Sequence, residues 1–134
     1  MGIPTLIKTL TAADDASLSF VDGTDDVVLD GTYDEYMFVF TDIGPATDNV
    51  LFSFQVNATD DPGGGYDTSL ITSTTFLAYH NEADTDTTLT YNSETDQAQA
   101  AGFQILATGQ GNGGDESAAG ILHLFNPSST TYVK

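Results

Sequence analysis

The fold class is decided by one stretch of the sequence, residues 33–57, which reads YDEYMFVFTDIGPATDNVLFSFQVN. In residues 36–41 an aromatic side chain stands at every second position, so the aromatic residues share one face of a strand. Residues 50–57 repeat this alternation, and the link 44–49 is rich in residues that favour turns. The pattern predicts a β-hairpin whose aromatic face forms the centre of the core.

The rest of the chain also consists of short β-type segments separated by turn residues. Alternating or β-branched runs predict further strands at residues 6–10, 16–21, 27–29, 69–80, 87–91, 120–125 and 130–134. The run at 69–80 is expected to break near Ser73. Residues 96–106 approach helical spacing, but Gly102 interrupts them, so strand or irregular structure is favoured there. These features predict an all-β fold, an antiparallel β-sandwich that is jelly-roll-like, in a single domain over residues 1–134.

The charge balance is the most unusual property of the composition. Sixteen Asp and four Glu stand against Lys8 and Lys134, which gives a formal net charge of −18. Such a surface repels polyanions, so we expect no nucleic-acid partner and no binding to anionic membranes. The chain has no cysteine, which excludes disulfides and thiolate metal sites. No signal peptide or membrane-spanning run is recognisable, and a soluble protein is expected.

Few residues are candidates for catalysis. His80 and His123 are the only imidazoles, and His123 is expected on a strand face, because nothing near it in the sequence supplies a nucleophile and an orienting group. The glycine-rich stretch Gly109–Gly114 lacks the lysine and the following helix of a phosphate-binding loop. We therefore expect a protein that is not an enzyme. Adjacent carboxylates are abundant, so a polysaccharide hydrolase that uses two of them stays an open alternative.

Calcium is the metal that the sequence favours. It takes about six to eight oxygen ligands from loop carboxylates and carbonyls. Two acidic turns have a suitable density of oxygen atoms, although neither matches the twelve-residue EF-hand pattern. The candidate ligands are Asp22, Asp25, Asp26, Asp84 and Asp86. No other cofactor is expected.

Three stretches of the chain resemble a known group of proteins. They are residues 29–49, with a Tyr-x-x-Tyr before an aromatic strand and a Pro-Ala-Thr-Asp turn, residues 79–83 (YHNEA), and residues 120–134 (GILHLFNPSSTTYVK). Together they resemble uncharacterised structural β-domain proteins, decoration or tail-appendage subunits, of marine tailed bacteriophages. The resemblance spans most of the chain. It implies a place on the virion surface after synthesis in the host cytoplasm, and it implies no catalytic residues.

The end of the sequence predicts how the protein assembles. Proteins of this group usually continue with further strands, whereas this sequence ends within a predicted strand. Either the protein is a shorter variant of this group, or another subunit supplies the missing edge. An unpaired strand edge is a template for aggregation, so we expect a neighbouring chain to pair with it. The predicted assembly edge consists of Thr130, Thr131, Tyr132, Val133 and Lys134. A homo-oligomer follows, with a trimer favoured, whose association strengthens with salt or Ca²⁺.

The function expected from these features is that of a capsid decoration or tail-fibre subunit, which acts through contacts with its own copies and with capsid or tail proteins. The alternative is a carbohydrate- or receptor-binding module of a tail appendage. In that case the glycine-rich loops Asp60–Tyr66 and Gly109–Asp115 would form the recognition end.

Overall fold

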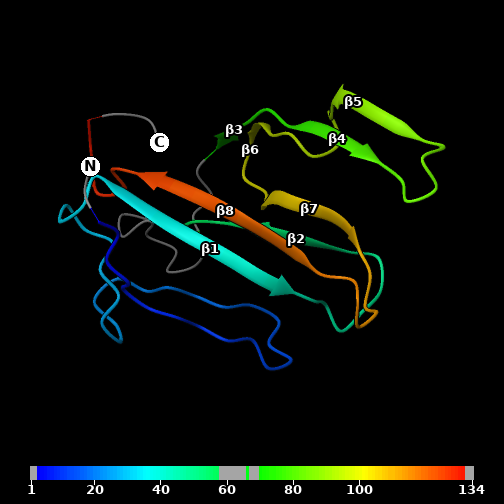
Figure 1. Ribbon diagram of the computed structural model, residues 1–134. Helices are drawn as coiled ribbons and strands as arrows, with labels where there is room; N and C mark the ends of the chain where they lie inside the picture. Colours follow the sequence, from blue (N-terminus) through cyan, green and yellow to red (C-terminus); the bar gives the residue numbers. More distant parts are fainter. Residues whose placement is uncertain (1–2, 58–65, 67–69, 132–134) are drawn as a thin grey trace. The chain divides into compact units, whose positions relative to one another are not determined.

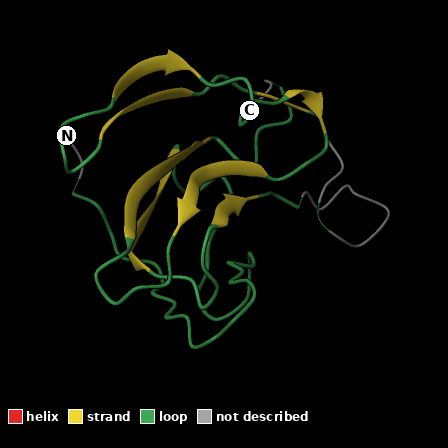
Figure 2. Ribbon diagram, turned by 90° about the vertical axis from the view of Figure 1, so that its right-hand side faces the viewer, coloured by secondary structure: helices red, strands yellow, loops and turns green. Residues whose placement is uncertain are grey.

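The computed structural model describes residues 3–57, 66 and 70–131. All regular structure within these residues is β-strand, as Figures 1 and 2 show. The strands are β1 (Glu35–Ile43), β2 (Val50–Phe54), β3 (Ile71–Thr72), β4 (Phe76–His80), β5 (Thr87–Tyr91), β6 (Ala98–Ala100), β7 (Gln104–Gln110) and β8 (Ala118–Phe125). In this part of the chain they pair antiparallel as β1–β8, β2–β7, β3–β6 and β4–β5. The predicted all-β antiparallel fold class is confirmed.

The chain divides into two compact units. The first consists of Met1–Ala46 and Ser117–Lys134 and contains β1 and β8. The second consists of Thr47–Glu116 and contains β2 to β7. A single sandwich domain over the whole chain stays a prediction.

The β1–β8 ladder organises the first unit. Its register places Tyr36 opposite Leu124 and Phe38 opposite Leu122. These side chains share one face of the ladder, because alternate residues of a strand point to the same side. The ring of Phe20 packs edge-on against Phe38, with 5.4 Å between the ring centroids. This face of the ladder therefore forms the interior of the first unit.

The predicted hairpin over Tyr33–Asn57 is wrong. Both of its strands exist, but β1 pairs with β8 and β2 pairs with β7. β8 gives β1 a longer apolar partner than β2 does, because β8 has eight residues and β2 has five. Asp42 and Asn49, at the two ends of the link, have left-handed backbone conformations with φ of 54° and 57°.

Three other predicted strands are also wrong, those at residues 6–10, 16–21 and 27–29. The described residues before Glu35 contain no strand. At residues 21–27 the backbone groups close local turns instead: the Thr24 amide donates to the Val21 carbonyl, and the Val27 amide donates to the Thr24 carbonyl, both at 3.0 Å. Leu18, within the predicted strand 16–21, is 44% exposed. These turns occupy hydrogen-bonding groups of Val21 and Val27 that ladders of residues 16–21 and 27–29 would need.

The described residues bury few hydrophobic side chains. Among them only Val27 (5% exposed) and Tyr36 (4% exposed) are buried. The Tyr36 hydroxyl donates a hydrogen bond of 2.9 Å to the Asp30 carbonyl. The Tyr33 ring packs edge-on against the Tyr36 ring, with 5.8 Å between the ring centroids. Burial raises the pKa of Tyr36 above its ordinary value. Because so little apolar surface is fully covered, much of it stays available on the strands.

The second unit agrees with the sequence-based expectations more closely. The run at 69–80 breaks, as predicted, between β3 and β4. Residues 96–106 contain β6 and the start of β7, and the expectation that they are not helical is confirmed. The buried Gln104 side chain donates hydrogen bonds of 3.0 Å to the carbonyls of Thr95 and Ile105. This buried amide fixes the start of β7 against the turn that precedes β6.

Candidate interaction surface

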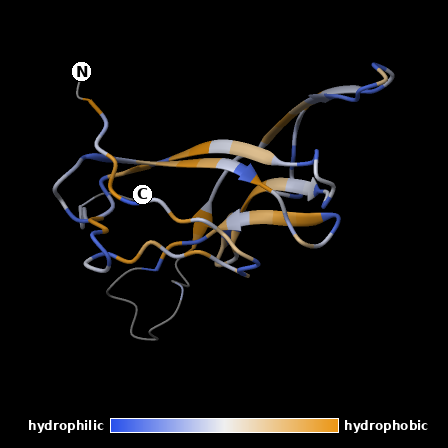
Figure 3. Ribbon diagram, turned by 60° about the horizontal axis from the view of Figure 1, so that its bottom comes forward, coloured by the Kyte–Doolittle hydropathy of each residue, from blue (hydrophilic) through white to orange (hydrophobic). Residues whose placement is uncertain are grey.

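The face of the β1–β8 ladder opposite Tyr36 and Phe38 is apolar and exposed. We call it the exposed face, and its residues are Glu35, Met37, Val39 and Thr41 of β1 with Ala119, Ile121, His123 and Phe125 of β8. Its four large apolar side chains are between 46% and 59% exposed. Figure 3 shows hydrophobic (orange) stretches along the strands. A contiguous apolar area of this kind usually marks a site of interaction.

The register makes the exposed face continuous across the two strands. Val39 lies opposite Ile121 at its centre, and Met37 lies opposite His123. Side chains that face each other across an antiparallel pair are close enough to pack together. The apolar groups therefore form one area that spans both strands.

One ion pair lies at the end of the exposed face. The Nδ1 atom of His123 is 2.5 Å from the Oε1 atom of Glu35, and the His123 ring stacks on Phe125 with 6.1 Å between ring centroids and 12° between planes. The sequence placed His123 on a strand face opposite Leu122 and Leu124, and this is confirmed. The pair can hold and orient a proton. The side chains next to it, Met37 and Phe125, carry no hydroxyl, thiol or amine group.

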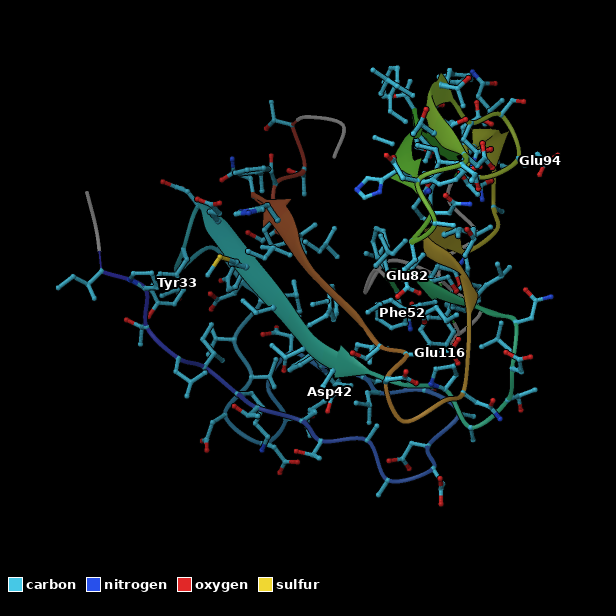
Figure 4. All side chains as sticks on the ribbon, turned by 45° about the vertical axis from the view of Figure 1, so that its right-hand side comes forward. Tyr33, Asp42, Phe52, Glu82, Glu94 and Glu116 are labelled. Carbon is cyan, nitrogen blue, oxygen red and sulfur yellow. The ribbon has the colours of Figure 1, made fainter. Side chains whose placement is uncertain are left out.

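The exposed face differs from the rest of the protein in its charge. Residues 35–41 and 119–125 contain one carboxylate, Glu35, whereas the chain has 20. When the His123 imidazole is protonated, the two charges offset each other. The acids next to this stretch are Asp34, directly before β1, and Asp42, which lies at the end of β1 where the ladder register shifts (Figure 4). A second acidic body could approach this face with less repulsion than at the acidic turns of the chain.

The predicted assembly edge falls largely outside the described residues. Thr130 and Thr131 lie in a bend after the turn that ends β8, and the Thr131 amide donates to the Ser129 hydroxyl at 3.3 Å. They are not part of a strand, so the strand predicted from residue 130 is wrong at its start. Tyr132, Val133 and Lys134 lie outside the described residues, and the role of the edge in assembly stays a prediction.

The first group of predicted calcium ligands closes a turn. The Asp22 carboxylate accepts a hydrogen bond of 2.8 Å from the Leu29 amide. Asp25 lies 4.0 Å from the ammonium of Lys8, and both Asp25 and Asp26 have left-handed backbone conformations. Asp22 and Asp25 thus have partners within the first unit.

The second group lies in the turn between β4 and β5. The Asp86 carboxylate accepts a hydrogen bond of 3.0 Å from the Tyr79 hydroxyl, and Asp84 has a left-handed backbone conformation. His80, at the end of β4, has its Nδ1 atom 3.3 Å from the Asn81 carbonyl. No cluster of three or more His, Cys, Asp or Glu suited to a metal ion occurs among the residues that the structure describes. Calcium binding stays a prediction.

Of the two loops proposed for carbohydrate recognition, the structure describes one residue of the first and all residues of the second. Of Asp60–Tyr66 only Tyr66 is described, and its ring packs edge-on against Phe103 at 5.5 Å. In the loop Gly109–Asp115 the Gly113 amide donates a hydrogen bond of 2.8 Å to the Glu116 carboxylate (Figure 4), and the Glu116 amide donates back to the Gly113 carbonyl. Sequence reasoning missed that Glu116 holds this loop through hydrogen bonds to Gly113. The signal in the sequence was an acidic residue placed directly after a glycine-rich loop.

No family model, no curated protein and no solved structure matches this chain. Among the described residues, no helix has the length and the apolar character needed to cross a membrane.

Proposed function

We propose that this chain is a non-enzymatic structural protein that works through contacts between its own copies, and that the exposed face of the β1–β8 ladder is where copies meet. The observation that carries the proposal is the apolar, nearly uncharged character of this face in a protein of net charge −18. Identical copies repel each other through their acidic surfaces. Association is therefore favoured where the acids are fewest and the apolar area is largest.

The energies involved predict weak to moderate self-association. Completely burying one large apolar side chain contributes about 1.5–3 kcal/mol, and these side chains are already about half covered. Met37, Val39, Ile121 and Phe125 of one copy would then contribute roughly 3–6 kcal/mol. The cost of losing translational and rotational freedom is about 4–15 kcal/mol, so the faces of at least two copies must contribute. Each of the four side chains is consequently significant for the affinity.

The place of this assembly is the virion surface of a tailed bacteriophage, as a capsid decoration or tail-fibre subunit in contact with capsid or tail proteins. The resemblance of residues 29–49, 79–83 and 120–134 to such proteins supports this part of the proposal, and the all-β antiparallel structure is compatible with it. A jelly-roll-like sandwich and a trimeric state belong to the same proposal. Nucleic acid is not a partner, because the charge of the chain repels polyanions.

Sedimentation velocity of matched variants tests the site of self-association. Ile121→Thr keeps a β-branched side chain but removes apolar area from the exposed face, and Leu51→Thr is the control, because Leu51 on β2 is 58% exposed and Ile121 is 59% exposed. We expect wild type to associate more strongly as salt rises from about 0.05 to 0.5 M, since screening weakens the repulsion. Ile121→Thr should associate about tenfold more weakly than wild type, and Leu51→Thr should match wild type.

Two results would refute the proposal: wild type that stays monomeric at every salt concentration, or equal association of the Ile121→Thr and wild-type proteins. Deletion of residues 130–134 separately tests the predicted assembly edge. Unchanged assembly of the deleted chain would remove the edge from the proposal and leave the exposed face in it.

A carbohydrate- or receptor-binding module is the second candidate. The hydrogen bonds between Glu116 and Gly113 favour it, because they order the loop Gly109–Asp115 before any ligand binds. Glycan-array binding that is lost in Glu116→Ala would support this function. A wild-type protein that binds no glycan on the array would argue against it.

A further inference from the structure

The hairpin formed by β4 and β5 carries a second exposed apolar area. Its register places Phe76 opposite Tyr91 and Ala78 opposite Leu89, so these residues share one face. Phe76 is 70% exposed, Leu89 82% and Tyr91 45%. The Phe76 and Tyr91 rings pack edge-on with 5.7 Å between their centroids. We call Phe76, Leu89 and Tyr91 the hairpin face.

Hydrogen bonds hold the hairpin in a defined shape at its turn. The Asn81 side-chain oxygen accepts hydrogen bonds from the amides of Thr85 (2.8 Å) and Asp86 (3.1 Å), and the Asn81 amide donates to the Asp86 carbonyl at 3.0 Å. The Tyr79 hydroxyl also donates to the Asp86 carboxylate. A surface that is already ordered loses little conformational entropy when it binds.

The base of the hairpin is ordered as well. The Tyr91 hydroxyl donates a hydrogen bond to the Asp96 carboxylate, and the Asn92 amide donates to the Thr75 carbonyl at 2.8 Å. A two-stranded hairpin by itself is only marginally stable in water. An ordered hairpin with large apolar side chains on its surface therefore suits a role in which a partner covers them.

Acidic residues lie at both ends of the hairpin. Residues 76–96 contain no lysine or arginine, and their carboxylates are those of Glu82, Asp84, Asp86, Glu94 and Asp96. The first three lie in the turn and the last two lie beyond the end of β5; Glu82 and Glu94 are labelled in Figure 4. A surface that complements this pattern is apolar at its centre and has cationic groups around it. The chain itself has only Lys8 and Lys134 as cations, so another copy does not provide that surface.

We propose that the hairpin face docks into an apolar groove of a different protein whose rim carries lysine or arginine side chains. Leu89 and Phe76 would enter the groove, and the carboxylates at the two ends of the hairpin would pair with the rim. This inference does not rest on self-association, because it uses residues of another strand pair. It also predicts the opposite response to salt: screening weakens the attraction of unlike charges, whereas it strengthens the association of like-charged copies.

A synthetic peptide with leucines at its centre and lysines at both ends serves as the probe for the full-length protein, with binding measured by calorimetry at low and high salt. This leucine–lysine peptide places apolar groups between two cationic ends, which matches the apolar centre and the acidic ends of the hairpin. The variant is Leu89→Thr, and the matched control is Leu6→Thr, since both leucines are 82% exposed. A second peptide, in which threonine replaces leucine, keeps the charge and lacks the apolar groups.

We expect Leu89→Thr to bind the leucine–lysine peptide about tenfold more weakly than wild type, or weaker still, while Leu6→Thr binds as wild type does. The threonine–lysine peptide should bind wild type at least about tenfold more weakly than the first peptide, and high salt should weaken all binding. Wild-type affinity in Leu89→Thr, an equal loss in Leu6→Thr, or equal binding of the two peptides would overturn the proposal. Sedimentation of Leu89→Thr without peptide separates the two proposals, because self-association through the β1–β8 ladder should be unchanged.

Discussion

Removing the Tyr36 hydroxyl should destabilise the first unit by an amount that the structure allows us to estimate. In Tyr36→Phe the aromatic ring keeps its place opposite Leu124, and only the hydrogen bond of 2.9 Å to the Asp30 carbonyl is lost. A hydrogen bond of this kind contributes about 0.5–1.5 kcal/mol. Because Tyr36 is 4% exposed, water cannot fully replace the lost partner. We expect a loss of about 1 kcal/mol and a fall in melting temperature of about 3–6 °C.

The pH dependence of this loss identifies its cause. Burial raises the pKa of Tyr36, so the contribution of this phenol is complete below pH about 10, the ordinary tyrosine value, and is lost as pH rises from there through the raised pKa. The difference in unfolding free energy between wild type and Tyr36→Phe should therefore be constant from about pH 6 to 9 and shrink above about pH 10. Urea unfolding followed by circular dichroism measures both quantities.

A matched variant distinguishes this effect from the general effect of removing a hydroxyl. Tyr79 also donates a hydrogen bond through its hydroxyl, to Asp86, but that pair is exposed. Tyr79→Phe should change the unfolding free energy by no more than about 0.5 kcal/mol. Equal stability of Tyr36→Phe and wild type, or a stability difference that does not change above pH 10, would show that the Tyr36 hydroxyl does not stabilise the fold as a buried hydrogen-bond donor.

Three further predictions concern other contacts of the structure. Phe20→Ala removes the edge-on contact with Phe38 and should cost about 1–3 kcal/mol in urea unfolding, less than for a fully buried Phe, because Phe20 is only partly covered. Hydrogen bonds from Thr32 lower the pKa of Asp30, so its contribution to stability is present above pH about 4 and is lost as pH falls through the lowered pKa; Asp30→Asn should flatten the acid limb of the stability curve. Glu116→Ala removes the acceptor of the Gly113 amide and should speed hydrogen exchange of that amide while global stability changes by less than about 0.5 kcal/mol.

The sequence predicted the type of secondary structure better than its pairing. The alternation in β1 and in β8 was visible, and both strands form. Their pairing was not predicted, because residues 44–49 carry strong turn signals that suggested a hairpin with β2. A turn in the sequence shows that the chain changes direction, and it does not show which strand comes next in the ladder. The partner was instead decided by apolar complementarity between Phe38 and Leu122, which lie 84 positions apart along the chain.

The candidate surfaces were harder to predict for a related reason. Alternation places Met37 and Val39 together on one face, but it does not show whether another layer covers that face. In the structure, residues before Glu35 contact the side of the ladder that carries Tyr36 and Phe38, although the predicted strands do not form there. Val39, on the other side, is 56% exposed. The acids near Asp22 and Asp84 were predicted as metal ligands from their type and density. Their left-handed backbone conformations and hydrogen bonds could be recognised only from the structure.

The acidity of this chain and the geometry of its turns are connected. Among the described residues, the non-glycine positions with positive φ are Asp14, Asp25, Asp26, Asp42, Asn49, Asp84, Gln99 and Asn126. Asp and Asn tolerate this conformation because their short side chains hydrogen-bond to the nearby backbone. Asn would satisfy the same geometry without a charge, so the geometry alone does not explain why Asp is used at five of these eight positions. In the proposed assembly, the additional charge keeps the turns of separate copies apart, and the face of the β1–β8 ladder, which has few acids, is where copies would approach most closely.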